Sequence, residues 1–167
     1  MKTQQKADTK QNSWFTFKLG DEEFGVHVQN VLNILELTSI TKVPKAPEYM
    51  TGVINLRGTV LPVIDTRLKL GMTSTEYTDN TCIVVMEIES NGEKIYFGGL
   101  VDKVEAVHEI SPEEIKTPTD HGNIYNSMFI EGIVERNDRF IMLLSLGKIF
   151  KNNELKTLQH KMETEQY

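Results

Sequence analysis

The chain has 167 residues, and its 18 basic and 24 acidic side chains give a formal net charge of −6. Such an acidic chain lacks the basic face that a general binder of nucleic-acid phosphates needs. Apolar residues make up 39% of the sequence, which is enough for a packed core and argues against a disordered protein. The single cysteine, Cys82, cannot form an internal disulfide and is typical of a reducing cytosol.

The N-terminal residues 1–13 are polar and contain no apolar core of a secretion signal. No apolar run approaches the roughly 18–20 residues of a membrane-spanning helix. We therefore expect a soluble, cytoplasmic protein in which residues 1–13 form a disordered arm. At the other end, residues 151–167 are expected to form a helix and tail, helical from about Asn153 to Glu163.

Short runs of alternating apolar and polar residues predict β-hairpins along the chain. The predicted hairpins, in chain order, span residues 15–28, 52–65, 82–101 and 129–144. Asn91-Gly92 between two alternating runs is a strong turn signal. Pro62, inside a predicted strand, indicates an edge position or a bulge. Many short strands at regular spacing favour an all-β fold, either a sandwich or small barrels.

The sequence contains a weak internal repeat. Phe24–Val31 resembles Phe97–Val104, which lies 73 positions later, and Gly52–Ile54 resembles Gly132–Val134, which lies 80 positions later. Two copies of a five-strand unit would account for the ordered chain. One copy alone is marginal as an independent core, so we expect the two units to pack on each other and share apolar contacts.

No residue pattern for catalysis or metal binding stands out. The histidines do not pair with each other or with cysteine at metal-ligand spacing. Cys82 opens an apolar run, as a buried structural cysteine does. The sequence has no glycine-rich phosphate-binding loop. We therefore expect no enzyme activity, no metal and no cofactor.

The feature that stands out is an arginine at a turn. Arg57 lies between two predicted strands, and Gly58 follows it. From the pattern alone, Arg57 is either a solvated turn residue or a recognition point for a partner. Arginine is frequent at binding hot spots because its planar fork makes several hydrogen bonds while its stem packs.

Three segments resemble the CheW family of bacterial chemotaxis coupling proteins, and the resemblance extends from Trp14 to about Leu158. The most specific segment is residues 43–65, which read VPKAPEYMTGVINLRGTVLPVID. Weaker matches lie at residues 17–26 and 98–104. The resemblance implies an all-β fold of two SH3-like five-stranded barrels packed on each other, with a short C-terminal helix.

We expect a single domain at residues 14–150 that contains both barrels. The barrel subdomains are expected at approximately 14–75 and 80–150, and strand exchange between them is left open. The resemblance also implies a function. Family members are non-enzymatic adaptors that couple the cytoplasmic tips of chemoreceptors to the histidine kinase CheA.

The implied partners are the regulatory domain of CheA and the chemoreceptor tip, with no nucleic acid and no direct insertion into the membrane. The free protein is expected to be a monomer that is recruited to membrane-associated receptor arrays. The alternative within the same fold is the CheW-like domain of a CheV-type or other two-component scaffold protein.

The resemblance also assigns site residues. Receptor binding falls on residues near the conserved turn of the family motif: Arg57, Val31, Gly52, Val104 and Asn33. Kinase binding falls on the loop near Leu37–Val43 in the first barrel and on a connection in the second barrel, at Ile40, Val43, Ile115 and Lys116. Asn33 replaces an acidic residue that many family members carry, so an ion pair expected there is either lost or shifted to Glu36.

Overall fold

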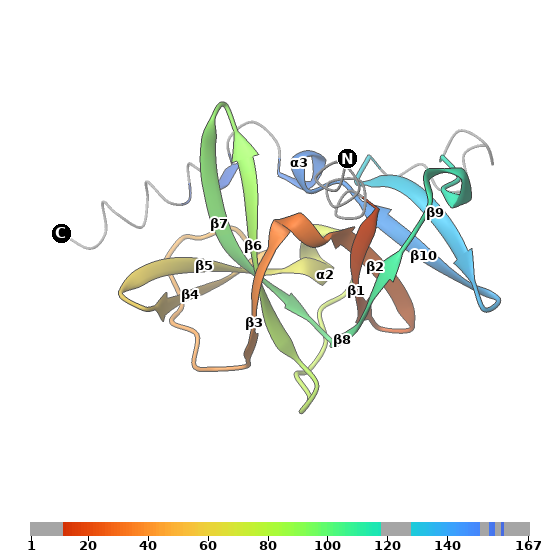
Figure 1. The fold of residues 1–167 in the computed structure, drawn as a ribbon. Coiled ribbons are helices and arrows are strands. Elements are labelled where there is room, and N and C mark those ends of the chain that lie inside the picture. Colours follow the sequence, from red (N-terminus) through yellow and green to blue (C-terminus); the bar gives the residue numbers. More distant parts are fainter. Residues whose placement is uncertain (1–11, 118–127, 151–153, 156–157, 159–167) are drawn as a thin grey trace.

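The computed structural model describes residues 12–117, 128–150, 154, 155 and 158. Within these residues, ten strands form two five-stranded sheets (Figure 1). We call the sheet with strand order β8-β1-β2-β10-β9 barrel A and the sheet with order β3-β6-β7-β5-β4 barrel B. The arm expected at residues 1–13 lies almost entirely outside the described residues.

The strands are short and are joined by turns and single helical turns. The strands are β1 (Ser13–Leu19), β2 (Glu22–His27), β3 (Val31–Glu36), β4 (Met50–Leu56), β5 (Thr59–Asp65), β6 (Cys82–Ser90), β7 (Glu93–Val101), β8 (Lys103–Glu109), β9 (Ile130–Arg136) and β10 (Arg139–Leu144). The helical turns are η1 (Val28–Asn30), α2 (Thr66–Lys69), η2 (Pro112–Glu114) and α3 (Leu146–Ile149). The predicted all-β fold is confirmed, as are all four predicted hairpins.

Two strands, β3 and β8, were not predicted. Each lies at the edge of its sheet, and most of its residues are exposed, so no regular alternation marks it in the sequence. Of the two alternatives expected for Pro62, the edge position is wrong, because β5 lies between β7 and β4. A bulge does lie close by, since the pairing of β4 with β5 shifts register between Met50 and Gly52. The proline is tolerated since the pairing of β5 with β7 begins only at Val63.

The internal repeat is reproduced in the strand pairing. Gly25 on β2 pairs with Leu143 on β10, and Gly98 on β7 pairs with Val63 on β5. Gly98 follows Gly25 by 73 positions, and Leu143 follows Val63 by 80 positions. The parallel pair β2–β10 in barrel A is therefore equivalent to the parallel pair β7–β5 in barrel B, as the two offsets of the sequence repeat require.

Each barrel takes its central hairpin from one copy of the repeat and its other three strands from the other copy. Barrel A combines residues 13–27 with residues 103–144, whereas barrel B runs from 31 to 101. The barrels therefore do not follow the contiguous ranges 14–75 and 80–150. The strand exchange that the sequence left open is complete and reciprocal.

Strand β1 is buried on both faces. Phe15, Phe17 and Leu19 belong to an apolar core that both barrels share. Trp14, on the opposite face, packs in the separate core of barrel A. Barrel B has its own small core as well, around Ile83. The shared core is the largest of the three, which explains how two small barrels reach a stable common interior.

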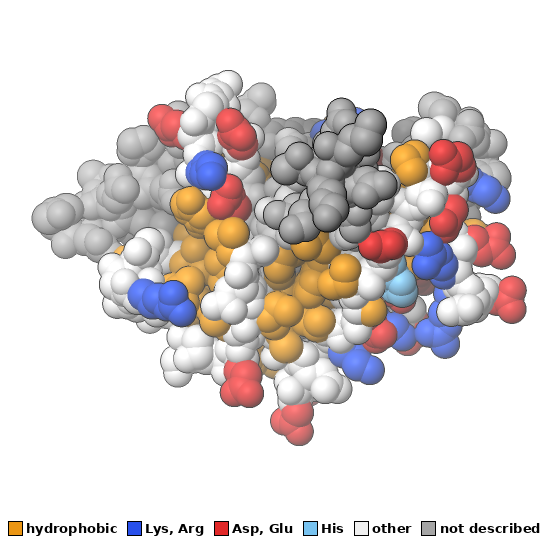
Figure 2. Space-filling model, viewed as in Figure 1, with side chains coloured by type: hydrophobic (Ala, Val, Ile, Leu, Met, Phe, Trp, Pro, Cys, Tyr) orange, Lys and Arg blue, Asp and Glu red, His pale blue; other side chains and the backbone are white. Residues whose placement is uncertain are grey.

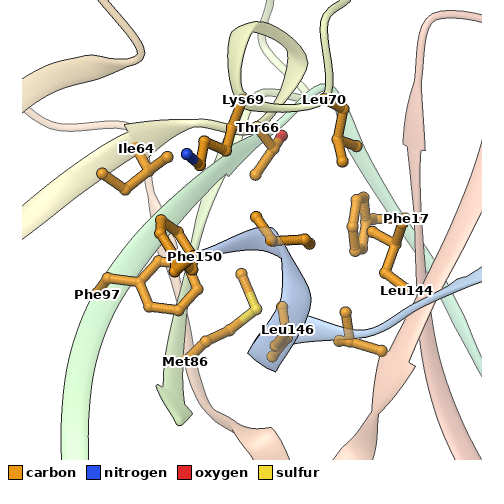
Figure 3. Close-up of a pocket in the computed structure, with 12 residues that line it drawn as sticks. Phe17, Ile64, Thr66, Lys69, Leu70, Met86, Phe97, Leu144, Leu146 and Phe150 are labelled. Atoms are coloured by element: carbon orange, nitrogen blue, oxygen red, sulfur yellow. The ribbon is translucent and has the colours of Figure 1, made fainter. Parts of the chain in front are cut away.

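The shared core contains one small apolar cavity of about 20 Å³ (Figure 3). Phe97 and Phe150 meet edge to face at one side of it, with ring centroids 4.9 Å apart, and Phe17 lies across from them. Lys69 lies beside the cavity with its Nζ 4.2 Å from the ring centroid of Tyr49. A cavity of this size with apolar walls is a packing defect rather than a ligand site.

The C-terminal segment closes the shared core. Leu155 and Leu158 are buried in it, and both are helical. Glu154 accepts a hydrogen bond from Lys69 Nζ at 2.7 Å. Most of the helix expected from Asn153 to Glu163 lies outside the described residues.

A polar clamp joins the two barrels near the turn between β1 and β2. Asp102, between β7 and β8, accepts hydrogen bonds from the Arg67 guanidinium and from the Gly20 N–H at 2.6 Å. Burial raises the pKa of the Asp102 carboxyl, but the Arg67 and Gly20 hydrogen bonds and the Arg67 charge outweigh it and hold the pKa below its usual value. Arg67 lies in α2, which follows barrel B strand β5, so the clamp bridges both copies of the repeat.

We predict that Asp102→Asn lowers the free energy of unfolding at pH 7 by about 2 kcal/mol, since it removes charge-assisted hydrogen bonds. Because the folded pKa is depressed, this stabilisation is complete above the unfolded Asp pKa of about 3.9 and is lost as the pH falls toward the folded value. Urea unfolding at pH 7 and pH 3 measures both effects, with Asp21→Asn in the neighbouring exposed turn as control. If the free energies of unfolding of wild type and D102N differ by the same amount at both pH values, the stabilising role of the clamp is contradicted.

Candidate functional site

The edge strands β3 and β8 carry exposed apolar side chains at equivalent positions. Ile34 on β3 is 44% exposed, and Val107 on β8, which follows it by 73 positions, is 60% exposed. Leu32, 50% exposed, has no partner on β6 because the register shifts between Val31 and Asn33. Figure 2 shows hydrophobic side chains gathered across the middle of this face, over and beside β3. We call this surface the apolar face.

Val31 and Val104, expected in a receptor-binding surface, lie at the base of the apolar face. Val31 pairs with Met86 on β6, and Val104 pairs with Phe17 on β1. Both valines are partly buried and pack against the shared core. They are equivalent in the repeat, as expected. Each valine belongs to an edge strand and packs against the core that the two barrels share.

A groove of about 380 Å³ lies at the end of barrel B beside the apolar face. Its lining includes both Arg57 and Asn33, so the structure brings together two of the predicted receptor-binding residues. The apolar lining consists of Leu32, Leu56, Val60, Leu61, Val85 and Tyr96, and Thr59 completes it. The Asn33 side chain accepts a hydrogen bond from the Ile34 N–H at 2.8 Å, which orients it within the bulged strand.

Arg57 occupies the tip of the β4–β5 hairpin in a left-handed conformation, with φ of 52°. Gly58 follows with φ of 84°, and its N–H donates to the Asn55 side-chain oxygen at 2.8 Å. This tight turn holds the arginine at the rim of the groove. Among the residues that the structure describes, none forms an ion pair or hydrogen bond with the Arg57 guanidinium, and the residue is exposed.

The equivalent hairpin of barrel A carries a paired arginine instead of an apolar groove residue. Arg136 replaces Leu56 in the repeat and donates to the Glu114 carboxylate at 2.9 Å and to the Glu109 carbonyl at 2.7 Å. The Arg136 hydrogen bond is the main reason that the pKa of Glu114 lies below its usual value. The two copies have therefore diverged, and barrel B presents an apolar groove beside an exposed arginine that pairs with no described residue.

The predicted kinase-binding residues lie elsewhere, along β4 and β9 at the outer edges of the two sheets. Ile40 packs against the core of barrel B, and Ile115 packs against the core of barrel A. Lys116 is exposed beside Ile115, whereas Val43 is partly buried against the shared core. Figure 1 shows β4 and β9 on opposite sides of the molecule, so the two segments face away from each other.

Gly52 is buried, although it was expected among the receptor-binding residues. A Cβ atom at this position would lie 2.2 Å from the Thr41 carbonyl oxygen. Gly52 therefore offers no surface to a partner, and the structure groups it with the Ile40 segment rather than with Arg57.

The sequence interpretation assigned no site role to three residues of the apolar face, Leu32, Ile34 and Val107. It also left out the groove residues Leu56, Thr59, Val60, Leu61, Val85 and Tyr96. The run Val31-Leu32-Asn33-Ile34-Leu35 carries apolar residues on both faces of an edge strand, and this signal could have found Leu32 and Ile34. Such a run in an exposed strand is unusual for a surface that only meets water.

Two small β-barrels fused through a shared core leave apolar side chains exposed on their edge strands, and a surface of this kind is typical of protein-interaction domains. A family model for the CheW-like domain matches residues 13–154. The chain belongs to the CheW family.

Named relatives cover most of the chain. The chemotaxis protein CheW of Rhizobium meliloti is 36% identical over 138 residues, which are 83% of this chain and 86% of that protein. The chemotaxis protein CheW of Bacillus subtilis is 30% identical over 133 residues, 80% of this chain and 83% of that protein.

A solved structure has the same fold. The scaffolding protein TtCheW from Thermoanaerobacter tengcongensis superposes with a TM-score of 0.73 at 32% identity, over 85% of this chain and 94% of that chain. In the described part of this chain, none of the helices is long and apolar enough to span a bilayer.

We predict that replacing an exposed residue of the apolar face lowers the free energy of unfolding less than replacing a residue that packs against the shared core. Ile34→Ser and Val107→Ser should change the free energy of unfolding by less than about 0.5 kcal/mol, because both side chains already meet water. Val31→Ser should cost about 1 kcal/mol or more, because it removes packing against the shared core. Urea unfolding followed by the fluorescence of buried Trp14 measures all three, and equal losses would contradict this assignment.

Proposed function

We propose that this protein is a non-enzymatic adaptor of bacterial chemotaxis that couples chemoreceptor cytoplasmic tips to the histidine kinase CheA. Membership of the CheW family supports the adaptor role. The observation that carries the proposal is the apolar face with its adjoining groove and unpaired arginine, because a surface of this kind is built for a protein partner.

The receptor tip is the partner that we assign to the apolar face. A helical hairpin offers ridges of apolar side chains, and these fit a groove bordered by exposed Leu32, Ile34 and Val107. Arg57 and Asn33 at the rim add polar contacts to such a partner. Val31 and Val104 support the face from below, so a change at either one would alter its shape.

The regulatory domain of CheA is the partner that we assign to the outer segments. Ile40 and Val43 form the segment beside β4, and Ile115 and Lys116 form the segment beside β9. Since these segments bridge to β4 and β9, whereas the apolar face is carried by β3 and β8, we infer that both kinds of partner bind at the same time, as coupling requires. In this role the protein works in the cytoplasm as a monomer that joins receptor arrays without entering the membrane.

We predict that Arg57→Ala weakens binding to a chemoreceptor cytoplasmic fragment by about 2 kcal/mol, because arginine at the rim of an apolar groove is a typical hot spot. Stability should not change, since alanine and arginine meet the same backbone restriction at this turn. Calorimetric titration measures the affinity, and thermal unfolding measures the fold.

Arg139→Ala provides the matched control, because Arg139 is an exposed arginine at the start of β10 in the equivalent hairpin of barrel A. It should leave receptor affinity unchanged. Receptor binding by R57A at wild-type affinity, with native thermal stability, would overturn the role given to the groove.

A further inference from the structure

The Ile40–Thr41 segment attaches to the edge strand β4 by a two-bond bridge. The Thr41 N–H donates to the Val53 carbonyl at 2.9 Å, and the Val53 N–H donates to the Thr41 carbonyl at 2.8 Å. Gly52, the residue before the bridge, lies directly beneath the segment. A Cβ atom on Gly52 would lie 2.2 Å from the Thr41 carbonyl oxygen and 2.8 Å from Ile40 Cγ2.

The Ile115–Lys116 segment attaches to the edge strand β9 in the same way. The Lys116 N–H donates to the Ile133 carbonyl at 2.9 Å, and the Ile133 N–H donates back to Lys116 at 2.8 Å. Gly132 precedes this bridge and is also buried. A Cβ atom on Gly132 would lie 2.4 Å from Ile115 Cγ2 and 3.5 Å from the Lys116 carbonyl oxygen.

The two barrels thus contain the same arrangement of a glycine, an isoleucine and a two-bond bridge. Gly132 follows Gly52 by 80 positions, which is the offset of the second half of the repeat. In each copy, a missing side chain lets an isoleucine lie flat against an edge strand, and two backbone hydrogen bonds then hold the next residue. Real Cβ atoms do not come within 3.0 Å of such neighbours, so any larger residue must displace the segment.

We propose that Gly52 and Gly132 are positioning residues for the two kinase-facing segments. Gly52 places Ile40, and Gly132 places Ile115, each against its own edge strand and in equivalent geometry. Neither glycine touches the partner. This inference rests on the proposed function, because that function assigns the two segments to the kinase.

The two sites differ in what obstructs a side chain, and this difference gives a sharp test. At position 52 the closest atom belongs to the backbone of Thr41, which cannot move without breaking the bridge to Val53. At position 132 the closest atom is a side-chain methyl group of Ile115. Trimming Ile115 should therefore relieve Gly132→Ala, whereas trimming Ile40 should not relieve Gly52→Ala.

Hydrogen exchange of the full chain tests the positioning without any partner. We expect Gly52→Ala to speed exchange of the Thr41 and Val53 amides by about tenfold or more, as local opening requires. The Lys116 and Ile133 amides should be unaffected. Gly132→Ala should give the reverse pattern, so each variant serves as the control for the other.

Titration with the regulatory domain of CheA and with a receptor cytoplasmic fragment tests the function. We expect both variants to bind the kinase domain about tenfold more weakly, a loss typical of a disturbed hot spot. Gly132→Ala, which lies in barrel A and not in the groove lining, should leave receptor affinity unchanged. A merely structural role would lower both affinities together with the melting temperature. Gly147→Ala adds the same methyl group at an exposed glycine with no atom within 4 Å and should change nothing.

The double variant Gly132→Ala/Ile115→Ala keeps the test valid even if a single variant folds poorly. It should regain wild-type exchange at Lys116 and Ile133 without regaining kinase affinity, because the contacting isoleucine is gone. If the wild type binds the kinase domain and both glycine variants bind it equally well, the positioning roles are overturned. If the wild type does not bind the kinase domain, the proposed function is overturned, while the exchange data still report whether the glycines hold the segments.

Discussion

Phe15, Phe17 and Leu19 of barrel A face the same apolar core as Phe97 and Met86 of barrel B. Each barrel is too small to supply a sufficient interior by itself. The fold therefore depends on the shared core. Three features stabilise it: the reciprocal hairpin exchange, the Asp102 clamp and the burial of the C-terminal leucines. The edge strands β3 and β8 are then left on one surface with their outer apolar side chains uncovered.

The two copies of the repeat kept their backbone and changed their surfaces. Position 56 is leucine and lines an open groove, whereas the equivalent position 136 is arginine and is satisfied by Glu114. Conversely, the glycine at positions 52 and 132 is the same in both copies, because the segment packed against it leaves no room for a side chain. The side chains at positions 56 and 136 thus distinguish the two barrels. The glycines at positions 52 and 132 keep the edges at β4 and β9 equivalent.

Local sequence patterns predicted those parts of the fold that local physics determines. The hairpins followed from alternation and turn residues, and the equivalence of Val31 and Val104 followed from the repeat. Strands β3 and β8 escaped prediction since edge strands need no alternation, and the exchange of hairpins depends on contacts far apart in sequence. The burial of Gly52 could not be predicted either, because the clash above it comes from Thr41, which a loop returns to the edge of β4.

The exchange of hairpins also bears on how the chain folds as it leaves the ribosome. All strands of barrel B are made once residue 101 is synthesised, but the β1–β2 hairpin must wait for β8, β9 and β10, which end at residue 144. Domains fold as units during synthesis, and contacts of large sequence separation form slowly. The earliest strands made are therefore among the last to complete their pairing, and until then Trp14 lacks Val134, Ile141 and Leu143, the residues that bury it. A nascent chain of this protein is most vulnerable to aggregation through its N-terminal hairpin.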